Sequence, residues 1–168
     1  INKKNMCGIT GCVFKNVIDF DHKQFKKIND LISHRGPDYS DVSFFKFADK
    51  NIYFGHNRLS IIDLNKTGNQ PMKSQDNRFT IIFNGEIYNH KELRNFLIKN
   101  FNIIFKGTSD TEILLEYFAK SNIHNFFDKI EGMFSFAIFD KKKNIIQFFQ
   151  LTKRKNLFGK IKTIRLYL

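Results

Sequence analysis

The chain alternates between two hydrophobic periods, and this alternation limits the folds open to it. Short apolar runs with strand character occupy residues 9–14, 42–47, 51–55, 79–83, 102–105 and 133–139. Apolar residues recurring every three or four positions predict amphipathic helices over 22–33, after an Asn89 cap, after Ser109 and near 125–130. Residues 48–50 join two of the strands as a hairpin turn. With 168 residues, the pattern predicts one domain in which helices lie on a sheet.

The net charge of +12 is concentrated at one end of the chain. Residues 1–140 carry 19 Lys and Arg against 16 Asp and Glu, whereas residues 141–168 carry 9 Lys and Arg and no acidic residue. A basic patch that binds RNA is one interpretation of this tail. A bias of composition is the other, and we favour it because the excess is local. We therefore expect no nucleic-acid partner.

Neither a membrane segment nor a metal site is expected. The chain has no run of about 18 apolar residues, and Ile1–Asn5 is short and polar, unlike a signal peptide. Cys7 and Cys12 have no neighbouring His or carboxylate cluster, so they fit neither a zinc site nor a disulfide framework. The simplest expectation is a cytoplasmic protein without metal.

Cys7 directly follows Met6, and removal of that methionine would make it the first residue of the mature chain. It would then carry both a thiol and a free α-amine, which is a nucleophile with its own base. An α-amine titrates near about 7.7–8.0, a suitable range for a base at neutral pH. The alternative is a buried structural thiol, the role that we expect for Cys12.

Polar residues at the ends of predicted elements are further site candidates. Asn84 and Gly85 follow a strand, and a side-chain amide beside a glycine N–H can direct two donors at one oxygen. A helix follows instead of the partner strand that a plain Asn-Gly turn would introduce. Arg58 could bind a carboxylate through its guanidinium, or be an ordinary surface arginine. Asp110 could bind an ammonium group, or only favour the start of a helix.

Six motifs follow one another along the chain: Met6-Cys7-Gly8-Ile9, His34-Arg35-Gly36-Pro37-Asp38, His56-Asn57-Arg58-Leu59-Ser60-Ile61-Ile62-Asp63, Gln70-Pro71-Met72, Asn84-Gly85-Glu86-Ile87-Tyr88-Asn89 and Ser109-Asp110-Thr111-Glu112. In this order they resemble the N-terminal glutaminase domain of glutamine-hydrolysing asparagine synthetases. These are class II amidotransferases of the N-terminal-nucleophile hydrolase fold. The resemblance implies an α+β protein, a four-layer α/β/β/α sandwich of two mainly antiparallel sheets. It implies a domain over residues 7–140, after an upstream segment 1–6 that is removed or lies before a misassigned start.

The same resemblance implies roles for individual residues. Cys7 would attack the side-chain amide of L-glutamine and form a thioester, while Asn84 and Gly85 hold the oxyanion. Arg58 would bind the α-carboxylate of glutamine and Asp110 its α-ammonium group. The remaining pocket residues that the resemblance implies are Leu59, Ile62 and Glu86. The His34–Asp38 loop could close over such a substrate, or be an ordinary turn.

Two departures from the family pattern are apparent. Where the family continues with Arg-Asp-Arg and Lys-Pro-Leu-Tyr-Tyr stretches, this chain has a divergent basic tail over 141–168. We hypothesise a frameshift after about Lys143, which resequencing and translation of the other frames would test. The second departure is the missing synthetase domain, because no Gly-Gly occurs for its Ser-Gly-Gly pyrophosphate loop. We expect no cofactor in this chain, since ATP and Mg belong to the absent domain, which would accept the ammonia.

Several alternatives to an asparagine-forming enzyme remain open. The chain could be an inactive truncated remnant, or the amidotransferase domain of an enzyme of surface-polysaccharide assembly. A nucleic-acid-binding module would use the basic tail. A Cys–His hydrolase would pair Cys7 with His34 or His56 and stay active with extra N-terminal residues.

Overall fold

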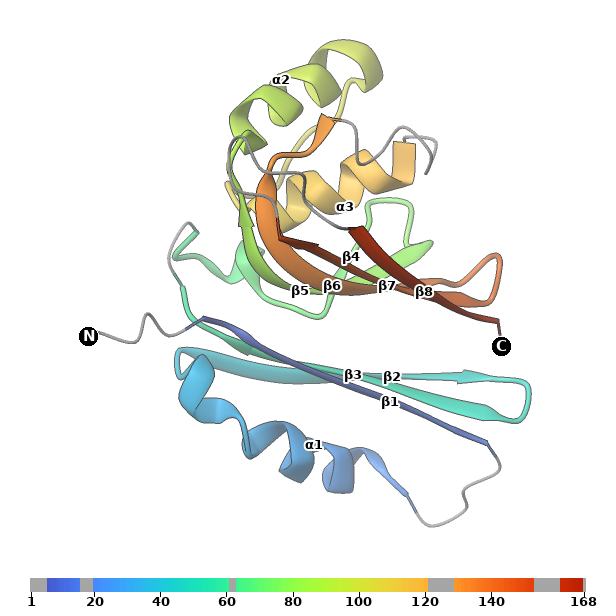
Figure 1. The fold of residues 1–168 in the computed structure, drawn as a ribbon. Coiled ribbons are helices and arrows are strands. Elements are labelled where there is room, and N and C mark those ends of the chain that lie inside the picture. Colours follow the sequence, from blue (N-terminus) through green and yellow to red (C-terminus); the bar gives the residue numbers. More distant parts are fainter. Residues whose placement is uncertain (1–5, 16–19, 61–62, 121–128, 153–160, 168) are drawn as a thin grey trace.

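The computed structural model describes residues 6–15, 20–60, 63–120, 129–152 and 161–167. It arranges them in four layers (Figure 1). Helix α1 (His22–Asp30) covers the outer face of a three-stranded sheet, and this sheet faces a five-stranded one. Helices α2 (His90–Phe101) and α3 (Asp110–Lys120) cover the far side of the second sheet. The expected α/β/β/α sandwich is thereby confirmed.

Both sheets pair their strands in antiparallel fashion throughout the described residues. Sheet A has the order β1-β3-β2, and its strands are Gly8–Lys15 (β1), Tyr39–Phe47 (β2) and Lys50–Arg58 (β3). Sheet B has the order β4-β5-β6-β7-β8, and its strands are Met72–Lys73 (β4), Phe79–Ile87 (β5), Gly132–Asp140 (β6), Ile145–Thr152 (β7) and Ile161–Tyr167 (β8). Two short 3-10 turns are η1 (Ser33–Arg35) and η2 (Lys66–Gly68).

Alternation along the strands places an apolar layer between each pair of structural layers. On β3, Ile52 and Phe54 point toward sheet B, whereas Tyr53 packs under α1. On β5, Ile82 points toward sheet A, whereas its neighbour Phe83 packs against the helices. Side chains with the same parity as Ile52 and Ile82 therefore face the space between the sheets, and this rule also positions the site.

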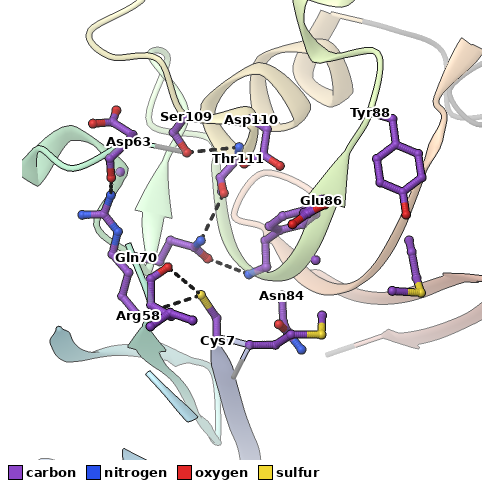
Figure 2. Close-up of a pocket in the computed structure, with 16 residues that line it drawn as sticks. Cys7, Arg58, Asp63, Gln70, Asn84, Glu86, Tyr88, Ser109, Asp110 and Thr111 are labelled. Carbon is purple, nitrogen blue, oxygen red and sulfur yellow. Dashed lines mark hydrogen bonds between the residues drawn. The ribbon is translucent and has the colours of Figure 1, made fainter. Parts of the chain in front are cut away.

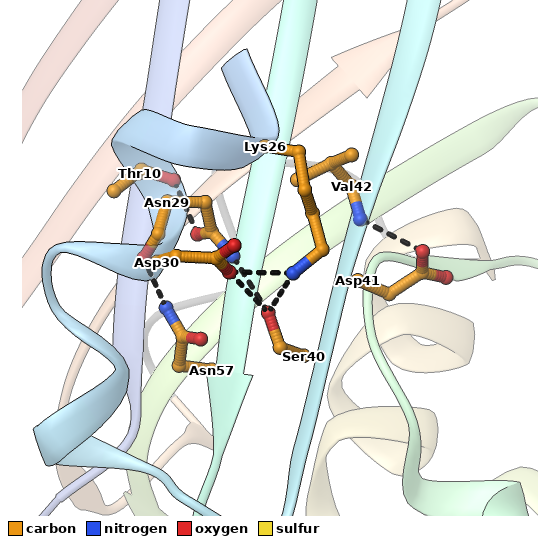
Figure 3. Close-up of polar contacts among 8 residues, drawn as sticks. All are labelled: Thr10, Lys26, Asn29, Asp30, Ser40, Asp41, Val42 and Asn57. Carbon is orange, nitrogen blue, oxygen red and sulfur yellow. Dashed lines mark hydrogen bonds and ion pairs between the residues drawn. The ribbon is translucent and has the colours of Figure 1, made fainter. Parts of the chain in front are cut away.

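Polar contacts fix α1 and the three strands of sheet A to one another (Figure 3). The α1 helix begins with a capping box between Asp21 and Gln24. At its last turn the buried Asn29 side chain accepts a hydrogen bond from Thr10 Oγ1 at 2.7 Å and donates to Ser40 Oγ at 3.1 Å. Its carbonyl accepts from Asn57 Nδ2 at 2.8 Å. One residue thus joins α1 to β1, β2 and β3.

Two predicted strands are longer than expected. The strand predicted over 51–55 extends through Arg58, so its polar end is part of β3. The strand predicted over 79–83 continues through Asn84 and Gly85 to Ile87, where Gly85 pairs with Phe134 of β6. The expectation that the strand ends at Asn84 was wrong, because β6 supplies a partner for this part of β5.

The strand predicted over 102–105 is absent. Asn102 ends α2 in the left-handed conformation, with φ of 52°. Ile103 then turns into the core, and the Arg94 guanidinium lies 4.4 Å from the centre of the Phe105 ring. Packing against the helices replaces strand pairing for this segment.

The predicted helix caps also differ in part from the structure. Asn89 makes no side-chain cap bond, and instead bonds the backbone of Lys129 and Glu131. Ser109 Oγ accepts from the Thr111 N–H at 3.2 Å, whereas Glu112 bonds the preceding loop and not the helix start. Both helices form at the expected places, and Ser109 caps α3 as predicted, whereas the Asn89 and Glu112 side chains bond other segments.

The stretch expected to be a basic tail, 141–168, contributes two strands to sheet B. β7 pairs with β6 from Met133 opposite Thr152 to Asp140 opposite Ile145. Sheet B therefore continues beyond residue 140. Most of the helix expected over 125–130 lies outside the described residues.

Candidate active site

A cavity of about 530 Å³ opens where the ends of the two sheets meet (Figure 2). Its lining includes seven of the eight residues proposed from the sequence: Cys7, Arg58, Leu59, Asn84, Gly85, Glu86 and Asp110. The eighth, Ile62, lies outside the described residues. The cavity is also lined by residues to which no role was assigned from the sequence, among them Asp63, Gln70 and Thr111.

Strand parity explains why distant residues meet in this cavity. Cys7 immediately precedes β1 and shares the parity of Ile9 and Val13, which pack between the sheets. Asn84 shares the parity of Ile82 on β5, so the thiol and the amide approach the same space from opposite sheets. Arg58 reaches the cavity from the end of β3.

Cys7 is held by the backbone that follows β3. Its Sγ accepts from the Leu59 N–H at 3.3 Å and lies 3.6 Å from the Leu59 carbonyl oxygen. Burial raises the pKa of the Cys7 thiol, although the Leu59 hydrogen bond and the charge of Arg58 act in the opposite direction. The thiol is therefore protonated at neutral pH, and a base must remove its proton before it can attack.

The Arg58 guanidinium is held by the loop that carries η2. Its Nη1 donates at 2.7 Å to both the Asn65 carbonyl and Asn69 Oδ1, and its Nη2 donates to the Asp63 carbonyl. A Cβ at Gly68 would lie 2.3 Å from Nη2, so only glycine allows the loop to approach so closely. The cation is fixed in the cavity wall before any ligand arrives.

Asp110 supplies the opposite charge as the first residue of α3. It is 5% exposed, and its Oδ2 accepts from the Ile87 N–H at 3.0 Å. Burial raises the pKa of Asp110, and the hydrogen bond from Ile87 opposes this shift. The buried carboxylate is suited to a cationic ligand, because pairing with a cation would offset the solvation that Asp110 loses on burial.

Asn84 and Gly85 lie side by side on β5 with polar groups available to a ligand. Gly85 has φ of 148°, and a Cβ there would lie 2.3 Å from the Met133 carbonyl oxygen. Asn84 Oδ1 is buried, and no described residue donates a hydrogen bond to it. The amide oxygen thus lacks a donor among the described residues, whereas an oxyanion would need the hydrogens on Nδ2.

Gln70 connects β5 to α3 within the cavity wall. Its Oε1 accepts from the Phe83 N–H at 2.6 Å, and its Nε2 donates to Thr111 Oγ1 at 3.1 Å (Figure 2). The residue belongs to a motif recognised in the sequence, but its partners are 13 and 41 positions away. Sequence spacing alone gave no indication of these contacts.

The loop of residues 34–38 supports the nucleophile. Arg35 Nε donates to the Cys7 carbonyl at 3.3 Å, and the Asp38 carboxylate accepts from the Ser60 N–H at 2.7 Å. A Cβ at Gly36 would lie 2.2 Å from the Asn57 carbonyl oxygen, so the loop packs directly on the end of β3. Its role in this structure is to hold the residues around Cys7.

No histidine in the described residues forms a hydrogen bond with Cys7. His34 is exposed, and His56 is fully buried with its Nε2 3.2 Å from the Phe83 carbonyl oxygen. Burial lowers the pKa of His56 to about 4, with the Phe83 contact opposing this shift and Arg58 adding to it. The geometry does not form the Cys–His pair considered from the sequence.

Two kinds of feature are absent from the described residues. No group of three or more His, Cys, Asp or Glu side chains is arranged to hold a metal ion there. No helix in the same residues is long and apolar enough to cross a membrane.

Residues 6–151 match the family model described as a glutamine amidotransferase domain. The chain belongs to this family. It is 38% identical over 144 residues to asparagine synthetase [glutamine-hydrolyzing] 3 of Bacillus subtilis, covering 84% of this chain and 22% of that protein. It is 36% identical over 141 residues to asparagine synthetase B of Escherichia coli, covering 83% and 24%. The chain thus spans about a quarter of the length of these relatives.

The fold also has a counterpart among solved structures. Glutamine phosphoribosylpyrophosphate amidotransferase of B. subtilis superposes with a TM-score of 0.63 at 19% identity, over 83% of this chain and 36% of that one. This likeness supports the N-terminal-nucleophile hydrolase fold.

Proposed function

We propose that this domain hydrolyses L-glutamine to glutamate and ammonia with Cys7 as the nucleophile. The observation that carries the proposal is that one cavity joins a cysteine thiol, the Asn84 side-chain amide beside Gly85 and the oppositely charged Arg58 and Asp110. A nucleophile, oxyanion donors and two charged anchors are what amide hydrolysis of an α-amino acid requires.

Arg58 and Asp110 would recognise the head of glutamine. Three guanidinium donors of Arg58 bond the protein, which orients the rest of the group for the α-carboxylate. The α-ammonium group would lie at Asp110, whose burial favours a cationic partner. Leu59 and Glu86 line the same space, and the Ile62 backbone is proposed from the family resemblance alone.

The chemistry would proceed in two steps. The Cys7 thiolate attacks the amide carbon, and the resulting oxyanion is held by Asn84 and the Gly85 N–H. Ammonia leaves with the proton taken from the thiol, and a thioester remains. Water then attacks the thioester, which releases glutamate and regenerates the thiol.

The base would be the α-amine of Cys7, because the raised pKa of the thiol calls for one and no histidine bonds it in the described residues. This role needs removal of the segment through Met6, which also lines the cavity. Removal would free the amine and clear space beside the thiol.

The ammonia would be used to form asparagine in a synthetase domain. This part of the proposal rests on the names of the relatives, which are glutamine-hydrolysing asparagine synthetases. ATP and Mg would serve that domain, and the cavity described above needs neither.

The test is glutamate release by protein expressed from Met6, with the N-terminus established by intact mass. We expect activity when the chain begins at Cys7, complete loss in Cys7→Ala and retention in the control Cys12→Ala. Asn84→Ala should lower kcat by about 10²–10³-fold. A folded chain that begins at Cys7 and releases no glutamate would instead identify an inactive remnant. Equal activity with residues before Cys7 retained would overturn the α-amine as base.

A further inference from the structure

Asp63 is a buried carboxylate that joins two loops on different sides of the cavity. It is 3% exposed, and its Oδ1 accepts from the Asn65 N–H at 2.8 Å. Its Oδ2 accepts from Thr67 Oγ1 at 2.9 Å and from the Thr108 N–H at 3.0 Å. Two of these donors belong to the loop that carries η2, and the third belongs to the loop that leads into α3.

One of these loops holds Arg58 in place, and the other carries Asp110. The loop with η2 supplies every acceptor that the structure gives Arg58, including the carbonyl of Asp63 itself. The second ends two residues after Thr108 at Asp110. Asp63 therefore bonds the loop that supports the cation to the segment that carries the anion, in parallel with the hydrogen bond from Gln70 to Thr111.

Close packing around the carboxylate fixes this junction. A Cβ at Gly107 would lie 2.5 Å from Asp63 Oδ2 and 2.5 Å from Thr67 Oγ1. A larger residue at this position would have to displace the Asp63 or Thr67 side chain. The carboxylate is therefore packed closely against both loops.

We propose that Asp63 is a positioning residue that sets the separation of Arg58 and Asp110, and thereby the affinity for the α-amino-acid head of the substrate. This inference rests on the proposed glutaminase function. Asp63 acts through the two anchors, and bonds neither the thiol nor the Asn84–Gly85 pair. It should therefore govern substrate binding and leave the rate of the chemical step nearly unchanged.

The carboxylate also has the charge that this role requires. Burial alone would raise the pKa of Asp63, but the hydrogen bonds from Asn65, Thr108 and Thr67, together with the charge of Arg58, hold it below the ordinary range. An asparagine at this position has an NH2 group in place of one carboxylate oxygen. That group would face an N–H or O–H donor, so the side chain could not accept all three hydrogen bonds.

The test compares glutamine kinetics of wild type, Asp63→Asn and Thr67→Val in protein that begins at Cys7. For Asp63→Asn we expect KM to rise about 10- to 100-fold, as for a lost hydrogen bond to a charged group, with kcat within about threefold. Thr67→Val removes one of the three donors and should raise KM less, whereas Thr67→Ser should restore it. The control is Asp76→Asn, an exposed loop carboxylate that bonds Ser74 and Arg78 away from the cavity, and its KM should not change.

A second readout separates this inference from the proposed function. Iodoacetamide has no amino-acid head, so Cys7 should be alkylated at the same rate in wild type and Asp63→Asn, as followed by mass mapping of the Cys7 peptide. The L-glutamate concentration that protects Cys7 should rise in Asp63→Asn in proportion to KM.

Absence of both hydrolysis and protection in wild type would overturn the proposed function and this inference with it. An active wild type with KM unchanged in folded Asp63→Asn and Thr67→Val would overturn only the role of Asp63. A fall in kcat without a change in KM would do the same. If Asp63→Asn does not fold, the pair of Thr67 variants decides the question.

Discussion

At the scale of single residues, His56 is a direct link between the two sheets. Its Nε2 lies 3.2 Å from the Phe83 carbonyl, one residue before Asn84, so Nε2 must carry the hydrogen and donate it. Nδ1 is then an acceptor, and no described residue donates to it. A proton added to Nδ1 would place a charge at a fully buried site, which accounts for the pKa near 4.

This histidine should make the fold sensitive to mild acid. Between pH 6.5 and 4, His56 is protonated in the unfolded chain but stays neutral in the folded chain. The free energy of unfolding therefore falls as the pH falls, by about 3 kcal/mol in total. His56→Gln keeps an N–H donor and does not titrate. We expect urea denaturation at pH 7 and pH 4.5 to show a smaller acid-induced loss in His56→Gln than in wild type. Equal losses in the two proteins would contradict this assignment.

Residue-level prediction succeeded for groups whose chemistry is visible locally. Cys7, Arg58, Asn84 and Asp110 were proposed as site residues from their types and neighbours, and all four line the cavity. Their catalytic and binding roles remain predictions. Gln70 and Asp63 were not assigned roles, and His56 was considered only as a base for Cys7, because their contacts join segments 41, 45 and 27 positions apart.

At the scale of elements, α3 is buried along most of its length and organises the loops around it. Its carboxylates bond backbone N–H groups of three separate segments, the first of them at Ile87, which donates to Asp110. Glu112 accepts from Lys106 at 2.8 Å and Gly107 at 3.0 Å, and Glu116 accepts from Gln75 at 2.8 Å. The sequence predicted this helix from its apolar face. The partners of its acids could not be predicted, because they depend on how the loops fold over it.

Glu112→Gln should therefore weaken the fold more than an ordinary change of charge. A side-chain amide has one acceptor oxygen, so one loop N–H would lose its partner, at a loss of about 1–3 kcal/mol. The matched control is Glu92→Gln in the first turn of α2, where the side chain is exposed and the change should be within about 0.5 kcal/mol. Urea denaturation measures both. Equal small effects would show that the Glu112 contacts contribute little.

Strand boundaries were the least predictable feature at this scale. β5 continues past Asn84 because β6 pairs with it, whereas residues 102–105 form no strand because they pack on helices. In both cases the deciding partner is distant in sequence. Apolar periodicity identifies which segments are ordered, but pairing partners decide where each strand ends.

At the scale of the whole molecule, sheet B depends on residues beyond 140. Phe149 of β7 stacks on Phe136 with ring centres 4.7 Å apart and also contacts Phe118 of α3 at 6.0 Å. It is 3% exposed, whereas its neighbour Phe148 is 38% exposed. β7 therefore contributes to the same apolar layer as α3.

Phe149→Ala should lower the free energy of unfolding by about 3–5 kcal/mol, the range for a buried aromatic residue. Phe148→Ala removes the same atoms one position away and should cost about 1 kcal/mol, because much less of its surface is buried. Thermal and urea unfolding of the two variants would decide between them. Similar small losses would mean that β7 contributes little to the stability of sheet B.

The thiol and its proposed oxyanion donors belong to different sheets, so no single element fixes the distance between them. That distance is set by the thickness of the apolar layer formed by Ile52, Phe54, Ile82 and their neighbours. Protein interiors are close-packed and resist compression, so this layer acts as a rigid spacer for the reaction. Side chains that do not contact glutamine thereby set the distance between the Cys7 thiol and Asn84. Smaller side chains in this layer would move the nucleophile and the proposed oxyanion site relative to each other.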